Sequence, residues 1–232
     1  MSNTSKGKAS KGSKHQMQRI TLPQYKSLID ERLCDTLSWI SPCENDDFRE
    51  YQLNNDYICK RLGIKKDSFN GFWPSRQPLW DGIALGAEGT LYLFEAKSHI
   101  KEIVPGKSTQ SLENEKKISA AINRIAFKLS GIRITDSQRN IWRKKYYQIS
   151  NRLVFADKML SLIDSNTRYK NVVLIFLNFV NDETWRKEGK TVEFSSTWKT
   201  YYDNIFQEMG IRKNRIKKFN IKIMIFDLSP IN

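Results

Sequence analysis

Two predicted β-strands carry the charged residues whose types and spacing are best suited to chemistry. The stretches Leu79–Leu85 and Thr90–Lys97 are apolar and are joined by a Gly-rich turn, a pattern typical of a hairpin. Glu95 and Lys97 lie two apart on the second strand and therefore project from the same face. Asp81 on the first strand is their natural partner if the hairpin register places it on that face.

The turn between the strands decides the register. A three-residue loop over positions 87–89 places Asp81 directly opposite Glu95, and Gly89 supplies the left-handed residue that such a loop needs at its end. A four-residue loop over positions 86–89 would turn Asp81 to the other face. The turn chemistry favours the three-residue loop, so we predict that the two carboxylates share one face.

Two neighbouring carboxylates repel each other unless a cation lies between them. Oxygen ligands in this arrangement favour Mg²⁺ or Mn²⁺, and the Ala96 carbonyl can add a further protein oxygen. Lys97 beside the metal would orient or deprotonate an attacking water and oppose the charge that develops on phosphorus. These residue types predict metal-dependent hydrolysis of a phosphodiester; the alternative is a surface ion pair at a strand end.

The Glu-x-Lys pattern is weak by itself, because it occurs three times in this lysine-rich chain. Glu115 and Lys117 lie on a predicted helix, where residues two apart do not face each other, and the copy at 188–190 lies in a polar loop. Only the copy at 95–97 lies on a strand with an acidic residue across a hairpin.

The other elements predict an α/β fold with a mixed central β-sheet and flanking helices. The predicted helices cover Leu22–Trp39, Asp46–Leu62, Ser111–Leu129, Ser137–Ile163 with one break, and a segment from Ser196 that Gly210 ends. Besides the hairpin, the predicted strands are a buried one over Asn171–Val180 and an outer one over Phe219–Ile225. We expect one domain over residues 19–232 and a disordered basic tail over residues 1–18, which either solubilises the protein or follows phosphates.

The charge balance indicates an anionic partner. The 232 residues contain 39 Lys and Arg against 25 Asp and Glu, a net charge of +14. Nucleic acid is the expected partner, because no basic amphipathic helix suggests membrane docking. No apolar stretch approaches the roughly 20 residues of a membrane span, and we expect no secretory signal. Three cysteines without metal-ligand spacing favour a reducing, cytoplasmic location and argue against a zinc site.

The same residues resemble a known active-site motif. Pro78-Leu79-Trp80-Asp81, thirteen further residues and Glu95-Ala96-Lys97 resemble the motif of the PD-(D/E)XK nuclease superfamily. Weaker similarity to one group of its members, which includes the stretch 147–153, spreads over residues 39–182. The resemblance implies a restriction-endonuclease-like core with a four-stranded mixed sheet, Mg²⁺-dependent nuclease activity, and Asp81, Glu95 and Lys97 as the catalytic set.

Many members of this superfamily add an acidic metal ligand from the preceding helix. Glu50 is the candidate here, unless it is an ordinary solvated carboxylate on a helix face. The superfamily core also has a strand immediately before the Asp strand, whereas residues 63–78 show no clear β pattern.

A later helix carries polar residues that can contact nucleic acid. Gln148, Asn151 and Arg152 share one ridge, where they can hold a water or the scissile phosphate, with Arg152 as a bidentate clamp; the alternative is helix surface or a helix–helix hydrogen bond. Three basic residues of the preceding helix can follow a nucleic-acid backbone, unless they form an ordinary solvated face: Lys117, Arg124 and Lys128.

These features together predict a Mg²⁺- or Mn²⁺-dependent deoxyribonuclease that acts through metal-activated water. The rival interpretation is a catalytically silent nucleic-acid-binding module of the same fold. DNA against RNA and internal against terminal cutting stay open at this point.

Overall fold

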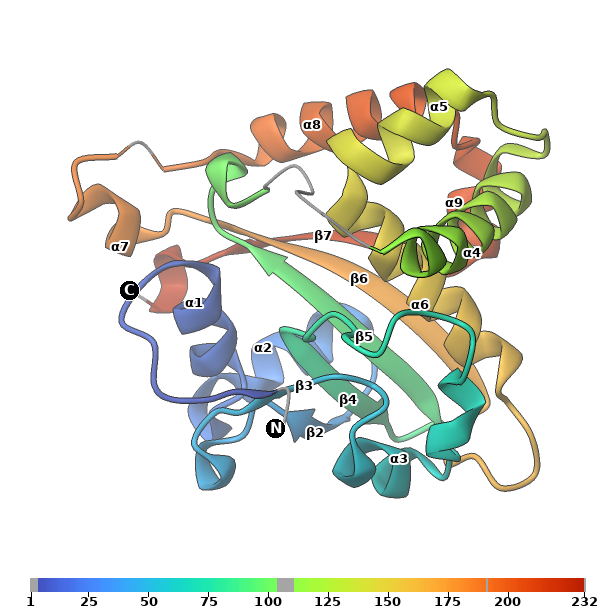
Figure 1. Cartoon of the computed structure of the whole chain (residues 1–232). Helices are drawn as coiled ribbons and strands as arrows, with labels where there is room; N and C mark the ends of the chain where they lie inside the picture. The colour runs from blue at the N-terminus through green and yellow to red at the C-terminus, as the bar shows by residue number, and fades with distance from the viewer. Residues whose placement is uncertain (1–3, 104–110, 191, 232) are drawn as a thin grey trace.

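A mixed β-sheet forms the centre of the molecule. The computed structural model describes residues 4–103, 111–190 and 192–231, and within them the main sheet has the strand order β2-β4-β5-β6-β7 (Figure 1). These strands are β2 (Leu37–Ser41), β4 (Gly82–Gly86), β5 (Thr90–Lys97), β6 (Asn171–Val180) and β7 (Ile221–Asp227). β2, β4 and β5 alternate in direction, whereas β5, β6 and β7 are parallel. The predicted α/β class with a mixed, helix-flanked sheet is confirmed.

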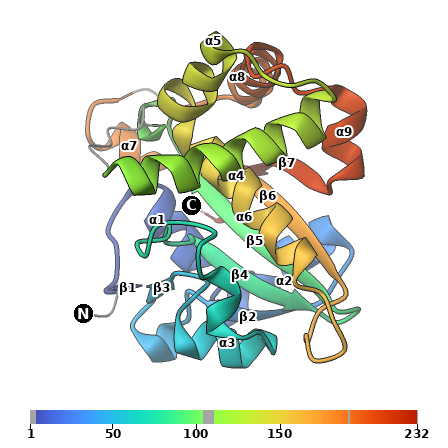
Figure 2. The ribbon, with the colours of Figure 1, turned by 45° about the vertical axis from the view of Figure 1, so that its right-hand side comes forward.

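Helices cover both faces of the sheet, and each face has its own apolar core. One core lies under α1 (Gly12–Ile20) and α2 (Pro23–Leu33) and includes Phe94 of β5. The other includes Leu93 and lies under α4 (Leu112–Ser130), α6 (Tyr147–Ser161) and α8 (Ser195–Glu208). Figure 2 shows α4 and α6 in front of the sheet. Because side chains alternate along a strand, Glu95 and Lys97 continue the row of Leu93 on the α4–α6 side.

Shorter elements complete the described part of the chain: β1 (Thr4–Ser5), β3 (Glu50–Tyr51), α3 (Asp56–Leu62), α5 (Asp136–Asn140), α7 (Glu183–Arg186) and α9 (Lys213–Lys218). Among the helices in the described ranges, none combines the length and the hydropathy that crossing a membrane requires.

From β4 onward the elements follow the predicted pattern closely. β6 has the predicted bounds and is buried along almost its whole length, as a doubly covered strand should be. The Ser111 side chain caps α4, and Gly131 ends that helix with a φ of 78°. A π-helical turn at Ile141–Lys145 makes the predicted break between α5 and α6.

The predicted helix over Leu22–Trp39 is wrong in its last third. α2 ends at Leu33, because Cys34 takes a left-handed conformation with a φ of 53°. The chain then enters β2, which pairs antiparallel with β4. In the main sheet the strand before β4 is therefore β2, and residues 63–78 contain no strand, as their lack of a β pattern predicts.

The predicted helix over Asp46–Leu62 is wrong in its first half. α3 begins only after Asn55, whose side chain accepts the N–H of Tyr57 at 2.9 Å. Glu50 lies on β3 instead, next to Tyr51, whose carbonyl accepts the Trp80 N–H at 3.0 Å. This contact brings β3 beside the start of the hairpin.

The N-terminal segment is folded where the structure describes it. β1 pairs with β3, and α1 packs on β5. Met17 of α1 is 1% exposed, and the Gln16 amide donates to the buried Asp182 carboxylate at 2.7 Å. The expected disordered tail is therefore wrong for these residues, because α1 buries apolar and polar side chains against partners far along the chain.

Candidate active site

The β4–β5 hairpin has the register that its turn predicts. Gly82 pairs with Phe94 and Leu85 with Leu91, which is the predicted register, and Asp81 directly precedes the first of these pairs. Gly89 ends the loop with a φ of 76°, in the left-handed region that the three-residue loop requires. The predicted loop length and register are confirmed.

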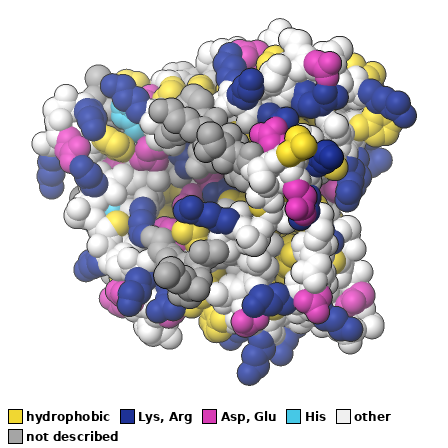
Figure 3. Space-filling model, in the orientation of Figure 1, with side chains coloured by type: hydrophobic (Ala, Val, Ile, Leu, Met, Phe, Trp, Pro, Cys, Tyr) yellow, Lys and Arg dark blue, Asp and Glu magenta, His cyan; other side chains and the backbone are white. Residues whose placement is uncertain are grey.

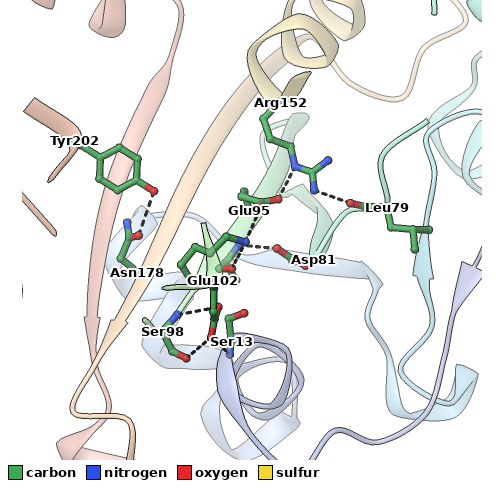
Figure 4. Close-up of polar contacts among 11 residues, drawn as sticks. Ser13, Leu79, Asp81, Glu95, Ser98, Glu102, Arg152, Asn178 and Tyr202 are labelled. Carbon is green, nitrogen blue, oxygen red and sulfur yellow. Dashed lines mark hydrogen bonds and ion pairs between the residues drawn. The ribbon is translucent and has the colours of Figure 1, made fainter. Parts of the chain in front are cut away.

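Asp81 reaches across to the second strand of the hairpin. Its Oδ2 accepts the Ala96 N–H at 2.8 Å, and the close-up shows it beside Glu95 (Figure 4). Burial and repulsion from Glu95 raise the pKa of Asp81 to about 7, although Lys97 acts to lower it. The negative charge of Asp81 is thus only partly compensated, a condition often found where a protein holds a cation.

Glu95 has a cation on each of its carboxylate oxygens. Lys97 Nζ donates to Oε1 at 2.5 Å, and Arg152 Nε donates to Oε2. Burial acts to raise the pKa of Glu95, but Arg152 and then Lys97 outweigh it, so the pKa is lowered. Glu95 is therefore ionised and firmly held.

Arg152 comes from α6 and is 5% exposed. Its guanidinium lies 4.7 Å above the Trp80 ring and donates through Nη2 to the Leu79 carbonyl at 2.8 Å. Its Nη1 is buried and has no hydrogen-bond partner among the described residues. Arg152 thus binds Glu95 in this structure rather than standing open on a helix ridge, and its role as a phosphate clamp stays a prediction.

The two polar neighbours of Arg152 on α6 differ in exposure. Asn151 is 7% exposed, and its Oδ1 is buried without a hydrogen-bond partner in the described ranges. Gln148 is half-buried. Asn151 Oδ1 can accept and Arg152 Nη1 can donate a further hydrogen bond beside the site. The proposed contact of these residues with a water or phosphate stays a prediction.

Glu50 and Lys14 add a third ion pair beside the hairpin. Lys14 Nζ lies 3.4 Å from Glu50 Oε1. Burial raises the pKa of Glu50, while Lys14 lowers it and the charge of Glu95 raises it further. Glu50 is therefore within electrostatic reach of Glu95, although it comes from β3 and not from a helix.

Glu102 is a site neighbour that the sequence did not single out. It accepts from Ser98 Oγ at 2.9 Å and from the Ser13 N–H at 3.2 Å, and so joins the end of β5 to α1 (Figure 4). The negative charge of Glu102 also favours the protonated form of Lys97. Like the contact of Lys14, this one depends on the fold of the N-terminal segment and has no local sequence signal.

The basic residues of α4 do not join this group. Lys117 pairs with Glu113 at 2.6 Å, and Lys128 pairs with Asp157 at 2.6 Å. Arg124 is exposed and lines a separate cavity. A role for these residues in following a backbone is therefore separate from the chemistry at the hairpin.

The donor atoms around Asp81 suit a hard divalent cation. They are the carboxylates of Asp81 and Glu95 and the Ala96 carbonyl, oxygens of the kind that Mg²⁺ and Mn²⁺ prefer. However, Lys97 Nζ also donates to the Ala96 carbonyl at 3.0 Å, and no group of three acidic, His or Cys side chains among the described residues is placed to hold a metal ion. A cation that both carboxylates coordinate would therefore compete with Lys97 and Arg152 for the oxygens of Glu95.

Comparison of the chain with protein-family models, with curated proteins and with solved structures finds no match in any of the three. The interpretation of the site therefore depends on its geometry and on the residue types that meet there.

Proposed function

We propose that this protein is a divalent-metal-dependent nuclease that hydrolyses phosphodiester bonds, with DNA as the expected substrate. The observation that carries the proposal is the meeting of Asp81, Glu95 and Lys97 at one point of the sheet. Carboxylates beside a buried ammonium are the groups that metal-assisted attack of water on a phosphate uses. The same three residues carry the resemblance to the PD-(D/E)XK superfamily.

The carboxylates have the first role in this proposal. Asp81 and Glu95 hold the cation, and the Ala96 carbonyl and Glu50 are the further oxygens at hand. A bound Mg²⁺ or Mn²⁺ supplies a polarised phosphate oxygen and a bound water of lowered pKa. Arg152 is a positioning residue, because it fixes Glu95 from the side opposite Lys97.

Lys97 has the role of a charged donor. Burial acts to lower the pKa of Lys97, but Glu95 and Asp81 outweigh it and the pKa is raised. An ammonium that keeps its proton can orient a water and oppose negative charge on the phosphate, but it does not accept a proton at neutral pH. The sequence leaves two roles for Lys97, to orient the attacking water or to deprotonate it, and the raised pKa favours the first.

The surface charge supports a polyanionic substrate. Lys and Arg side chains are spread over much of the visible face of the molecule (Figure 3). With a net charge of +14, the protein attracts a phosphate backbone before any specific contact forms.

A catalytically silent nucleic-acid-binding module is the second candidate. It is favoured by the two ion pairs of Glu95, in which each carboxylate oxygen already has a basic partner. In such a module the carboxylates and Lys97 would only stabilise the end of the hairpin.

A cleavage assay with matched variants separates the two candidates. Circular DNA, linear DNA and RNA are incubated with the purified protein in Mg²⁺, Mn²⁺ or EDTA, and cleavage of DNA is expected only with a metal. Asp81→Asn, Glu95→Gln and Lys97→Met should each reduce the rate by about 100-fold or more. The control Glu88→Gln changes an exposed carboxylate in the loop of the same hairpin and should retain activity.

Circular dichroism checks that each variant is folded. Cleavage that persists in all three site variants would contradict the nuclease proposal. Binding without product in either metal would favour the second candidate.

A further inference from the structure

A cavity of about 540 Å³ lies beside the second half of α4, apart from the carboxylate site. Its walls come from α4, from the segment that leads to α5, and from α5 itself. This segment lies next to α4 in Figure 2. The lining residues used below are Asn123, Arg124, Phe127, Arg133, Ile134 and Arg139. None of them belongs to the site around Asp81.

Arginines give this cavity a positive charge that its own walls do not neutralise. Arg139 is fixed by Asn123 Oδ1 at 3.1 Å and by Asp136. Arg124 and Arg133 are exposed, and neither forms an ion pair within the described ranges. The cavity lining contains no acidic side chain. An anion with several oxygens, such as a phosphate, is the complementary ligand for guanidinium groups in this setting.

An aromatic ring lies beside these charges. Phe127 is 53% exposed although it lines the cavity, and Ile134 beside it is 8% exposed. A large exposed ring at the mouth of a cavity has open apolar surface for a flat partner. Guanidinium groups next to an exposed ring are the combination with which proteins hold a phosphate and stack a base.

We propose that this cavity binds one nucleotide unit of a single-stranded nucleic acid, with the base on Phe127 and the phosphate on Arg124 and Arg133. A phosphate alone would leave the ring uncovered, and a duplex keeps its bases stacked inside. The inference goes beyond the proposed function, because it requires no cleavage.

Binding of a fluorescent single-stranded oligothymidylate, measured by anisotropy in EDTA, tests the proposal on the full chain. Arg124→Glu combined with Arg133→Glu should weaken binding by about tenfold or more. Phe127→Ala should weaken it by about fivefold or more. The control, Lys60→Glu combined with Lys65→Glu, makes the same change in net charge at exposed positions elsewhere and should cost clearly less.

Each outcome bears on the proposal. If both double variants lose the same affinity, net charge alone explains the loss and the proposal is overturned. Unchanged binding by Phe127→Ala would overturn the proposal as well. A duplex of the same length whose binding Phe127→Ala weakens as much as that of the single strand would also overturn it, because a paired base cannot stack on Phe127. Competition by thymidine monophosphate that exceeds competition by inorganic phosphate supports a nucleotide site, and equal competition contradicts it. Because EDTA prevents metal-dependent cleavage, failure of the nuclease proposal leaves this test intact.

Discussion

At the scale of single residues, Glu95 is a buried carboxylate with a different cation on each oxygen. Its side chain is 3% exposed, and those of Lys97 and Arg152 are 9% and 6% exposed. A charge this deeply buried depends on its partners, because water cannot replace them. The ion pairs of Glu95 are therefore structural as well as part of the proposed chemistry.

Removing Arg152 should reveal this dependence. Arg152→Met leaves one oxygen of Glu95 without its cation and should lower the free energy of unfolding by about 3 kcal/mol or more. Adding Glu95→Gln should recover part of the loss, because the buried charge is then gone. Chemical denaturation measures both values.

The control Lys145→Met breaks an exposed ion pair with Glu208 and should lower the free energy of unfolding by less than about 1 kcal/mol. Equal losses for the buried and the exposed pair would contradict the account.

Asp81 should make the protein less stable as pH rises. Its pKa of about 7 in the folded protein lies above the ordinary 3.8, so the folded state binds the proton more tightly. The stability that this proton confers is complete at low pH and is lost as pH rises from about 4 to about 7. Asp81→Asn removes the charge and keeps an oxygen that can accept the Ala96 N–H.

Without metal, Asp81→Asn should therefore melt at least about 2 °C above the wild type at pH 8, with a smaller difference towards pH 4. Thermal denaturation across this range measures the difference. Asp136→Asn, at an exposed position, is the control and should show no such trend. If the melting temperatures of the wild type and Asp81→Asn change with pH in parallel, the charged Asp81 carboxylate does not destabilise the folded protein.

At the scale of elements, local signals predict local structures. The turn at 86–89 determines the hairpin register, and the apolar spacing of 111–129 predicts α4, because both depend on residues close in sequence. β2 is not predicted, because Leu37–Ser41 continues the apolar pattern of the preceding helix. Its partner β4 lies more than forty residues later.

The candidate site divides in the same way. Asp81, Glu95 and Lys97 are predictable because one hairpin carries all three. The spacing of the polar residues on α6 indicates a ridge, but only the packing of α6 on the sheet shows that Arg152 meets Glu95. Lys14 has no local signal, since its place beside Glu50 depends on how α1 docks.

The docking of α1 depends on Met17. Its Cε lies 2.3 Å from the position that a Cβ on Gly82 would take, so the missing side chain of that glycine makes room for it. Met17→Ala should lower the free energy of unfolding by about 2–5 kcal/mol, as for other fully buried side chains. Gln24→Ala, at an exposed position of α2, is the control and should change it by less than about 0.5 kcal/mol. Equal stability of the two variants in chemical denaturation would mean that α1 is not docked.

At the scale of the whole molecule, the site collects charges from distant parts of the chain. Glu50, Asp81 and Glu95 face Lys14, Lys97 and Arg152, and these six come from α1, β3, the hairpin and α6. Each of the three basic groups lies near a carboxylate, although the charge of Asp81 is only partly compensated. A divalent cation therefore has to compete with basic side chains for the carboxylates, and its binding should shift at least one of them.

Diffraction from crystals soaked in Mn²⁺, with data collected for anomalous scattering, tests this claim most directly. The account predicts an anomalous peak between the carboxylates of Asp81 and Glu95, with Glu95 released from Lys97 or from Arg152. The account would be contradicted if, at saturating Mn²⁺, both ion pairs of Glu95 stay formed and no anomalous peak lies between these carboxylates.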